Sequence, residues 1–260
     1  MNTTNESYRE LLSSVLRDGV IAFPRSQMTK ELLGLSARFD MNAPVIVSDV
    51  RKLSYKFMAA EAIWIVNGDN SVRGIAPYNR NIAAFSDNGV AFFGAYGPKF
   101  MEQRQYIIRK LFEDDQTRQA VMTIWRERPD NSRDIPCTVS LGWVIRGGVI
   151  HCFVNMRSSD LWLGLPYDIF NFTAMTMDIR NLYNKGMDQS VLLGNLYWSA
   201  NSVHLYEQHF ENAEQIVLEE SESVFIPTSI KQDYSAFMES LIAIRDDPGS
   251  EHDWIRSSLS

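Results

Sequence analysis

The stretch VNMRSSDLWLGLPYDIFNF, residues 154–172, joins the end of an apolar strand to the start of a helix. From Asp168 onward, apolar residues recur at helical spacing as far as Gly186, a residue type that commonly ends helices. This pattern predicts a helix over residues 168–184. Aspartate is a preferred N-cap residue, so the simplest interpretation of Asp168 is a cap that accepts hydrogen bonds from the first free backbone N–H groups.

Apolar periodicity predicts further elements on both sides of this stretch. Helical spacing covers residues 5–18, 52–66, 103–113 and 232–245. Strand patterns cover Val121–Trp125, Thr138–Ile145 and Val149–Asn155. The last two strands are joined by Arg146-Gly147-Gly148, whose glycines suit a tight hairpin turn. Helices mixed with antiparallel strands predict the α+β class.

The composition predicts one globular domain over residues 1–260. A content of 45% hydrophobic residues is ample for a sizeable core, and no internal repeat or flexible linker divides the chain. No apolar run approaches a bilayer span, and the start MNTTNESYREL has no basic region followed by an apolar one, so we expect a cytoplasmic protein that does not bind membranes. The formal net charge of −7 argues against nucleic acid as a partner, but a local arginine cluster could still bind one phosphate.

Metal and dinucleotide sites are not indicated by the sequence. The four histidines and two cysteines show no CxxC or HExxH spacing, and neither GxGxxG nor GxxxxGK[ST] occurs. We therefore expect no metal and no dinucleotide-binding fold. Two cysteines are too few for a disulfide framework, although one bridge stays open. Cys152 lies on an alternating strand, where packing is its simplest role.

Cys137 is the first candidate for chemistry. In RDIPCTVSLGW it precedes an apolar strand, where its thiol could point into a cleft. A nucleophilic thiol needs positive charge nearby to lower its pKa, and Arg118, Arg133 and Arg157 could supply it if the fold gathers them. The competing interpretation is a core residue, which most lone cysteines are.

Two further places combine polar groups with apolar surroundings. Glu61, in KLSYKFMAAEAIWIV, falls on the apolar stripe of the predicted helix, where desolvation would raise its pKa and suit it to acid and base chemistry near neutral pH. The alternative is a residue at the margin of the stripe with its carboxylate in water. In HLYEQHF, His204 and Tyr206 are two apart, so they share one face of a strand end and could donate to a sugar hydroxyl.

Taken together, these residues resemble the thymidylate synthase superfamily and, within it, the pyrimidine nucleotide hydroxymethylases. The resemblance spans about residues 20–215 and rests on the order of its motifs. They are Pro24-Arg25, ARFDM (37–41), EAIW (61–64), GAYG (94–97), QTRQ (116–119), PC (136–137), VNMRSSD (154–160), LGLPYD (163–168) and HLY (204–206). The resemblance implies a thymidylate synthase-like fold, with a mixed or antiparallel sheet flanked by helices and a homodimer formed through the sheet.

The resemblance also implies catalytic roles. Cys137 matches the nucleophile that adds to C6 of the pyrimidine, which lets C5 attack the one-carbon unit of 5,10-methylenetetrahydrofolate, the cosubstrate. Glu61 matches the carboxylate that moves protons on the ring with ordered water. Tyr96 matches the tyrosine that lines the cleft near the nucleophile.

Binding roles follow from the same motifs. Arg25, Arg118 and Arg157, with Ser158, match the phosphate-binding residues of a pyrimidine nucleoside monophosphate site, and guanidinium groups suit two-point contacts to phosphate. In this family the residue that matches Arg118 reaches in from the partner subunit. Other matches are His204 and Tyr206 for the sugar hydroxyl, and Asp160 and Trp64 for the folate.

The resemblance gives Asp168 a second interpretation. Thymidylate synthases place Asn at this position, and deoxycytidylate hydroxymethylases place Asp. An Asn amide can accept from N3–H of uracil and donate to O4, whereas cytosine presents an acceptor at N3 and a donor at N4. A protonated Asp can serve cytosine, and an ionised Asp can pair with an N3-protonated ring. A buried polar edge left unpaired costs about 1–3 kcal/mol, enough for one side chain to select the base.

A dCMP 5-hydroxymethylase is therefore the leading expectation. Thr138 follows the nucleophile where thymidylate synthases have His, as in hydroxymethylases, which complete the exocyclic methylene with water instead of hydride. The alternatives are a ribo-CMP 5-hydroxymethylase, methylation of dUMP, and a lapsed nucleotide-binding member. The last is encouraged by Gln119, Gly142 and the end DDPGSEHDWIRSSLS, which differ from the family pattern. Retention of both a nucleophile and a proton-handling carboxylate argues against it.

Overall fold

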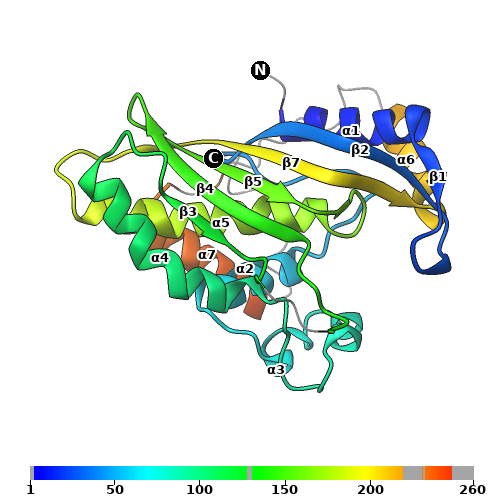
Figure 1. Ribbon diagram of the computed structural model, residues 1–260, viewed down its shortest axis with the longest axis horizontal. Helices are drawn as coiled ribbons and strands as arrows, with labels where there is room; N and C mark the ends of the chain where they lie inside the picture. Colours follow the sequence, from blue (N-terminus) through cyan, green and yellow to red (C-terminus); the bar gives the residue numbers. More distant parts are fainter. Residues whose placement is uncertain (1–2, 128–130, 219–229, 231, 248–260) are drawn as a thin grey trace.

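The computed structural model describes residues 3–127, 131–218, 230 and 232–247, which form a twisted sheet with helices packed on it (Figure 1). The helices are α1 (Thr4–Asp18), α2 (Tyr55–Val66), α3 (Val72–Ile75), α4 (Tyr96–Glu113), α5 (Leu165–Lys185), α6 (Phe210–Leu218) and α7 (Tyr234–Asp246), with short 3-10 turns η1 (Pro24–Ser26), η2 (Arg80–Phe85) and η3 (Glu207–His209). The strands are β1 (Val20–Ala22), β2 (Thr29–Asp40), β3 (Val121–Thr123), β4 (Thr138–Arg146), β5 (Val149–Met156), β6 (Ser159–Asp160) and β7 (Leu192–Tyr206). Most of the stretch DDPGSEHDWIRSSLS lies outside the described residues.

The sheet combines antiparallel and parallel pairs. Its order is β1-β2-β7-β5-β4-β3, with β6 added beside β7. Strand β7 pairs antiparallel with β2 and parallel with β5 and β6. Strands β4 and β5 form the predicted hairpin, in which Gly147 and Gly148 have φ of 58° and 73°, a conformation that favours glycine. The α+β class and a mixed sheet flanked by helices are thus confirmed.

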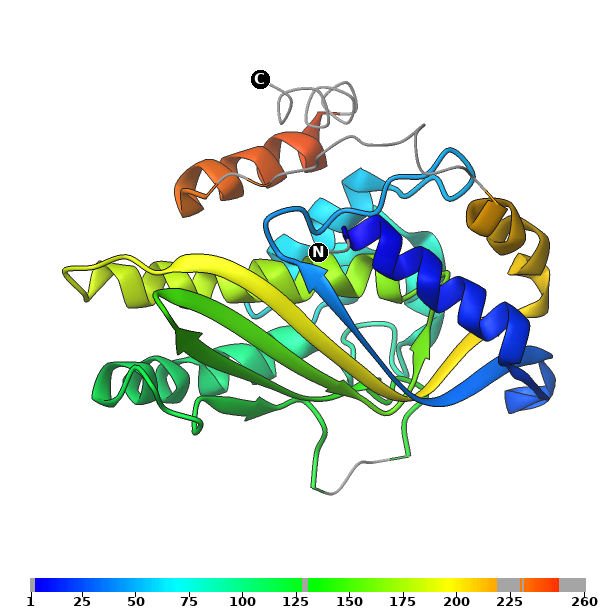
Figure 2. The same ribbon diagram turned by 90° about the horizontal axis from the view of Figure 1, so that it is seen from above.

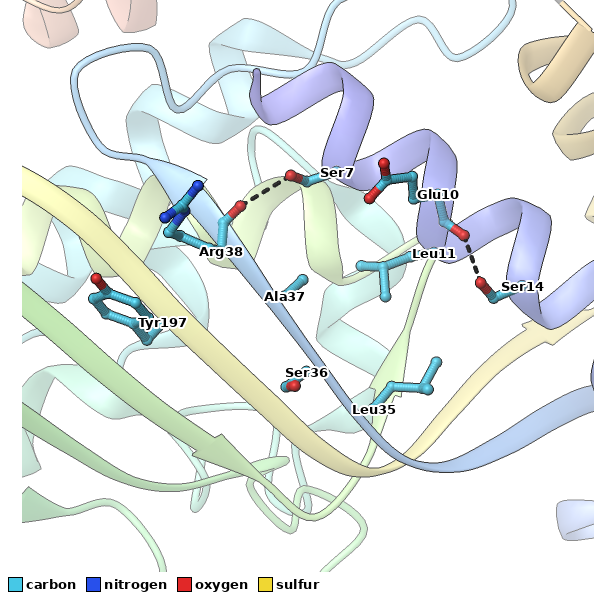
Figure 3. Close-up of a pocket in the computed structure, with 9 residues that line it drawn as sticks. All are labelled: Ser7, Glu10, Leu11, Ser14, Leu35, Ser36, Ala37, Arg38 and Tyr197. Atoms are coloured by element: carbon cyan, nitrogen blue, oxygen red, sulfur yellow. Dashed lines mark hydrogen bonds between the residues drawn. The ribbon is translucent and has the colours of Figure 1, made fainter. Parts of the chain in front are cut away.

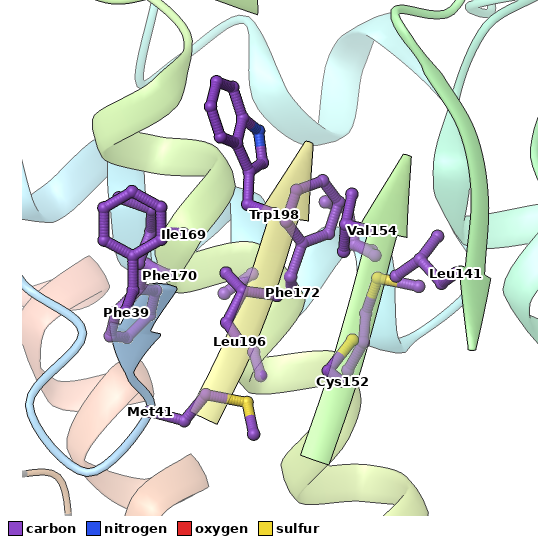
Figure 4. Packing of buried hydrophobic residues seen from close by; sticks show 14 of the residues in the cluster. Phe39, Met41, Leu141, Cys152, Val154, Ile169, Phe170, Phe172, Leu196 and Trp198 are labelled. Carbon is purple, nitrogen blue, oxygen red and sulfur yellow. The ribbon is translucent and has the colours of Figure 1, made fainter. Parts of the chain in front are cut away.

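The core lies between one face of the sheet and α5. Helix α5 packs against β5 and β7, and α2 in turn contacts α5 and α7, so helices stack in layers over that face (Figures 1 and 2). Side chains from the sheet and from α5 interdigitate there and are almost completely buried; they include Cys152, Val154, Phe170, Phe172, Leu196 and Trp198 (Figure 4). Cys152 therefore packs as expected, burial raises the pKa of its thiol to about 12, and both cysteines are free.

Two helices begin earlier than predicted. Helix α4 begins at Tyr96, because its first turn, Tyr96-Gly97-Pro98, has little apolar periodicity but tolerates proline. Helix α5 begins at Leu165 after Gly164, and Pro166, whose fixed φ suits a first turn, lies inside it. The N-cap interpretation of Asp168 is therefore wrong. Asp168 lies within the first turn, and its carboxylate does not cap the helix.

Two general features of the described residues bear on function. No helix among them is long and apolar enough to cross a membrane. Within the same residues, no three His, Cys, Asp or Glu side chains gather in a way that could hold a metal ion.

Candidate active site

Two adjoining cavities hold nearly all the residues that the sequence predicts for the site. The larger, about 860 Å³, is lined by Arg25, Cys137, Arg157, Ser158, Asp160, His204 and Tyr206. The smaller, about 170 Å³, is lined by Glu61, Trp64, Tyr96 and Asp168. Phe85 lines both cavities, and Gly164 of the larger lies so close to Asp168 that a methyl group there would be 3.5 Å from Asp168 Oδ2. Arg118 is exposed and lines neither cavity.

A separate hollow of about 550 Å³ lies beside α1 and β2 (Figure 3). Ser7 Oγ donates to the Arg38 carbonyl oxygen there, at 2.9 Å, and Ser14 Oγ donates to the Glu10 carbonyl oxygen, at 2.8 Å. None of the predicted site residues lines this hollow. The candidate site is therefore the pair of adjoining cavities and not this hollow.

Strand pairing brings the residues of the larger cavity together. Thr138 pairs with Met156, so the adjacent Cys137 and Arg157 meet, and the Arg157 amide donates to the Cys137 carbonyl oxygen at 2.8 Å. Parallel pairing of β6 with β7 sets Asp160 beside His204. At the end of β7, Tyr206 Oη lies 3.5 Å from Arg25 Nη2, and its ring meets that of His204 edge-on, with centroids 5.3 Å apart.

Arg157 fixes the segment that leads into Cys137. Its Nε donates to the Pro136 carbonyl oxygen at 3.0 Å and its Nη2 to the Ile135 carbonyl oxygen at 2.9 Å. Burial raises the pKa of the Cys137 thiol, and the charges of Arg157 and Arg25 oppose that rise. Arg133, in contrast, donates to Asp87 and to the Ser86 carbonyl oxygen. Of the three arginines considered from the sequence alone, only Arg157 acts on the thiol.

Glu61 lies in the smaller cavity and has the environment that its sequence pattern indicates. Asn171 Nδ2 donates to Glu61 Oε2 at 2.8 Å. Burial raises the pKa of Glu61 to about 7, against the opposing effect of that hydrogen bond. A carboxyl group with this pKa can both release and accept a proton near neutral pH.

Asp168 and Tyr96 share this cavity with Glu61. Burial, and then the charges of Glu61 and Asp160, raise the pKa of Asp168 well above its ordinary value, which favours the protonated form of its carboxyl group. In that form the carboxyl group offers one donor and one acceptor. Tyr96 accepts a hydrogen bond from Thr138 Oγ1 at 2.9 Å. Its ring stacks on that of Phe172, with centroids 6.3 Å apart and planes 7° apart. These contacts fix the tyrosine beside the two carboxyl groups.

The remaining walls of the smaller cavity suit a flat aromatic ring. Trp64 Nε1 donates to the Ser71 carbonyl oxygen at 3.2 Å, so the polar edge of the indole is already paired. Its ring meets Phe92 edge-on at 5.8 Å, and both line the cavity with Phe85. Asn171 Oδ1 is buried and, among the described residues, has no hydrogen-bond partner. The aromatic wall suits the flat ring system of a pterin.

Among the lining residues that the sequence did not indicate, Asn171, Asp134 and Phe85 bear most on the site. Asn171 could have been found, because it follows Asp168 by three positions on a helix and so shares its face. Asp134 precedes Cys137 by three positions, but nothing in the surrounding sequence predicts which way its side chain points. Phe85 is the last residue of η2, a turn with no apolar periodicity, so its sequence did not predict a place in the site.

Comparison with known proteins decides the family. The family model for thymidylate synthase matches residues 6–239 of this chain. This chain belongs to the thymidylate synthase family. Its similarity to that family therefore covers the whole sheet and both cavities, and the superfamily resemblance inferred from the ordered motifs is confirmed.

Two relatives illustrate how similar this chain is to individual proteins of the family. A deoxyuridylate hydroxymethyltransferase of Bacillus phage SP01 is 27% identical over 222 residues, covering 76% of this chain and 56% of the phage protein. A thymidylate synthase of Buchnera aphidicola subsp. Baizongia pistaciae (strain Bp) is 23% identical over 226 residues, covering 82% of this chain and 83% of that protein. This chain thus matches little more than half the length of the phage relative.

Proposed function

We propose that this protein transfers a one-carbon unit from 5,10-methylenetetrahydrofolate to C5 of a pyrimidine nucleoside monophosphate, with dCMP preferred, and completes a 5-hydroxymethyl group with water. The observation that carries the proposal is the half-buried Asp168, whose pKa is raised well above its ordinary value, beside Glu61 in a cavity that adjoins the Cys137 cleft. The folate supplies the electrophilic carbon. All other steps are assigned to side chains of this chain.

The larger cavity suits the nucleotide. Arg25, Arg157 and Ser158 line it and are assigned to the phosphate, and His204 and Tyr206, which also line it, are assigned to a sugar hydroxyl. Cys137 adds to C6, and the ring electrons make C5 nucleophilic toward the one-carbon unit. Once C5 has bonded to that carbon, Glu61 removes the C5 proton through ordered water. Asp160 and Trp64 are assigned to the folate, which would lie against the aromatic wall.

Cytosine is the base that the Asp168 carboxyl group favours. Addition of a thiolate at C6 pushes negative charge onto N3 of cytosine, and a neutral carboxylic acid can give its proton to that atom while its other oxygen accepts from the N4 amino group. Uracil can also pair with a neutral acid. Hydroxymethylation of dUMP is therefore the second candidate, and the name of the phage relative favours it. The described contacts do not separate dCMP from ribo-CMP.

We also propose a homodimer formed through the open face of the sheet. On that face, the exposed side chains Val121, Phe153 and Tyr197 alternate with core residues, and the rings of the last two stack with centroids 4.7 Å apart. Exposed Arg118 precedes β3 at the same edge. A partner subunit docked there is the simplest way for Arg118 to reach a phosphate. Analytical ultracentrifugation decides between a monomer and a dimer.

The test of the function is an assay with three labelled nucleotides. The protein is incubated with methylenetetrahydrofolate and, separately, 5-tritiated dCMP, CMP or dUMP, and tritium release and product mass are measured. We expect release to be fastest with dCMP and the product to carry a hydroxymethyl group. A methyl product from dUMP alone would contradict the proposal, and no release from any nucleotide would indicate a lapsed member.

Glu61→Gln tests the proton-handling role. Because Glu61 has a pKa of about 7, it is ionised and able to accept the C5 proton above that pH and is protonated below it. We expect tritium release by the wild-type protein to rise with pH through a limb centred near 7. Gln can still accept from Asn171, yet it cannot take a proton, so the variant should lose this limb and about 10²–10⁴-fold in rate. A limb near pH 7 that persists in the variant would assign the titration to another group.

A further inference from the structure

Asp134 is a carboxylate of the smaller cavity that none of the assigned roles uses. It lines that cavity together with Glu61 and Asp168. The other two carboxyl groups already have a partner or a proposed role. Asn171 donates to Glu61, and Asp168 is assigned to the base. Asp134 is also close enough to Cys137 to raise the pKa of its thiol. It therefore lies near both the nucleophile and the proton-handling residues.

The backbone holds Asp134 firmly in this position. The Gly94 amide donates to Asp134 Oδ2 at 2.7 Å, and the Asp134 amide donates to Ser132 Oγ at 3.0 Å. Only glycine at position 94 lets the two backbone segments come this close, because a Cβ atom there would lie 2.5 Å from the Asp134 carbonyl oxygen. The next two carbonyl groups, of Ile135 and Pro136, are fixed by Arg157. The Gly94 contact occupies one carboxylate oxygen and leaves the other available to the cavity.

From this geometry, and resting on the proposed function, we propose that Asp134 is the general base for the water molecule that completes the hydroxymethyl group. A second observation points to a water site in the same cavity. Asn171 is 3% exposed, its Oδ1 has no hydrogen-bond partner among the described residues, and it can accept one hydrogen of that water. Burial raises the pKa of Asp134, which makes its carboxylate a stronger base toward water.

The step conserves atoms and electrons. After departure of tetrahydrofolate, C5 carries an exocyclic methylene and C6 carries the Cys137 sulfur. A water lone pair forms the bond from oxygen to the methylene carbon, the methylene π electrons move into the ring, and Asp134 takes the proton. The ring electrons then restore the C5=C6 bond as the C6–S bond breaks, and Cys137 leaves as the thiolate. The proton on Asp134 passes to solvent.

Asp134→Asn separates this step from those before it. Asn has the same shape and can still accept from the Gly94 amide, but it cannot take the water proton. Tritium leaves C5 before water adds, so the variant should release about one tritium per site in a burst, while its hydroxymethyl product falls about 10²–10⁴-fold. 2-Mercaptoethanol supplies a thiolate, which needs no base, so adding it should restore turnover and yield the thioether. Asp87→Asn is the matched control: Asp87 binds Ser132 and Arg133 of the same segment but lines neither cavity, and this variant should keep the wild-type product.

The outcomes are distinct. A burst with little hydroxymethyl product and a thioether in its place supports Asp134 as the base. Hydroxymethyl product at the wild-type rate in Asp134→Asn overturns the assignment, and so does an equal loss of burst and product, which would indicate a role before water addition. If the wild-type protein itself makes no hydroxymethyl product, the proposed function fails, and the variant is not needed to show it.

Discussion

Cys137→Ala should abolish tritium release from every pyrimidine nucleotide, with a fall of about 10⁴-fold or more, because removal of a covalent nucleophile leaves no other route to an activated C5. Cys137 lines the larger cavity directly before β4, and no other described cysteine lines either cavity. Arg157 holds the residues before it through two backbone carbonyl groups. The backbone contacts of Arg157 therefore help to position the sulfur, whose side chain also packs against the core.

Cys152→Ala is the matched control for this prediction. It removes the second thiol of the chain, which is buried between β5 and α5 and lines neither cavity. We expect it to keep turnover and to lose some stability, since it deletes packed volume from the core. Binding of dCMP measured by calorimetry shows whether Cys137→Ala retains its nucleotide site. Tritium release by Cys137→Ala at a rate near that of the wild type would contradict covalent addition by this residue.

The sequence could predict those elements whose pattern is local. The helices α1, α2 and α7 and the hairpin of β4 and β5 follow from apolar periodicity and from glycines at the turn. Strand β2 did not follow, because exposed Leu33 and the positive-φ Gly34 interrupt its alternation. It is a strand because eleven of its residues pair with β7, from Thr29 with Tyr206 to Asp40 with Asn195, a partner far along the chain. Long-range pairing of this kind leaves little trace in a local pattern.

The residues of the site also differ in how far the local sequence predicts them. Glu61 could be named as a candidate from its residue pattern, because a carboxylate on an apolar stripe is a local inconsistency, but the same spacing also allowed a carboxylate in water. Arg157 and Cys137 could be named only as candidates, since their meeting depends on the register of β4 with β5. Asp134 could not be found at all, because its orientation is set by Gly94, a residue of a different segment. Side chains that are positioned by contacts between distant segments are the part of a site that a single sequence does not predict.

Asp168→Asn should reverse the choice of base. In the wild-type protein, burial and the neighbouring Glu61 and Asp160 raise the pKa of Asp168 well above its ordinary value, which favours the protonated carboxyl group. In that form Asp168 can give a proton to N3 of cytosine as negative charge develops there. An amide offers hydrogen bonds but no proton. We therefore expect kcat/KM for dCMP to fall about 10²–10⁴-fold, the usual contribution of a positioned general acid. With uracil, the amide can accept from N3–H and donate to O4, so activity with dUMP should be kept or increased.

The measurement for Asp168→Asn is the ratio of kcat/KM for dCMP to that for dUMP, in both proteins and at one pH. Tyr167→Phe is a suitable control on the same turn of α5, because Tyr167 Oη accepts from the Ser54 amide and the residue lines neither cavity. That variant should leave the ratio unchanged. A ratio that Asp168→Asn also leaves unchanged would mean that the base is read by other groups. Loss of both activities together would indicate that the carboxyl group is needed for addition to either ring, which is a role in catalysis and not in selection.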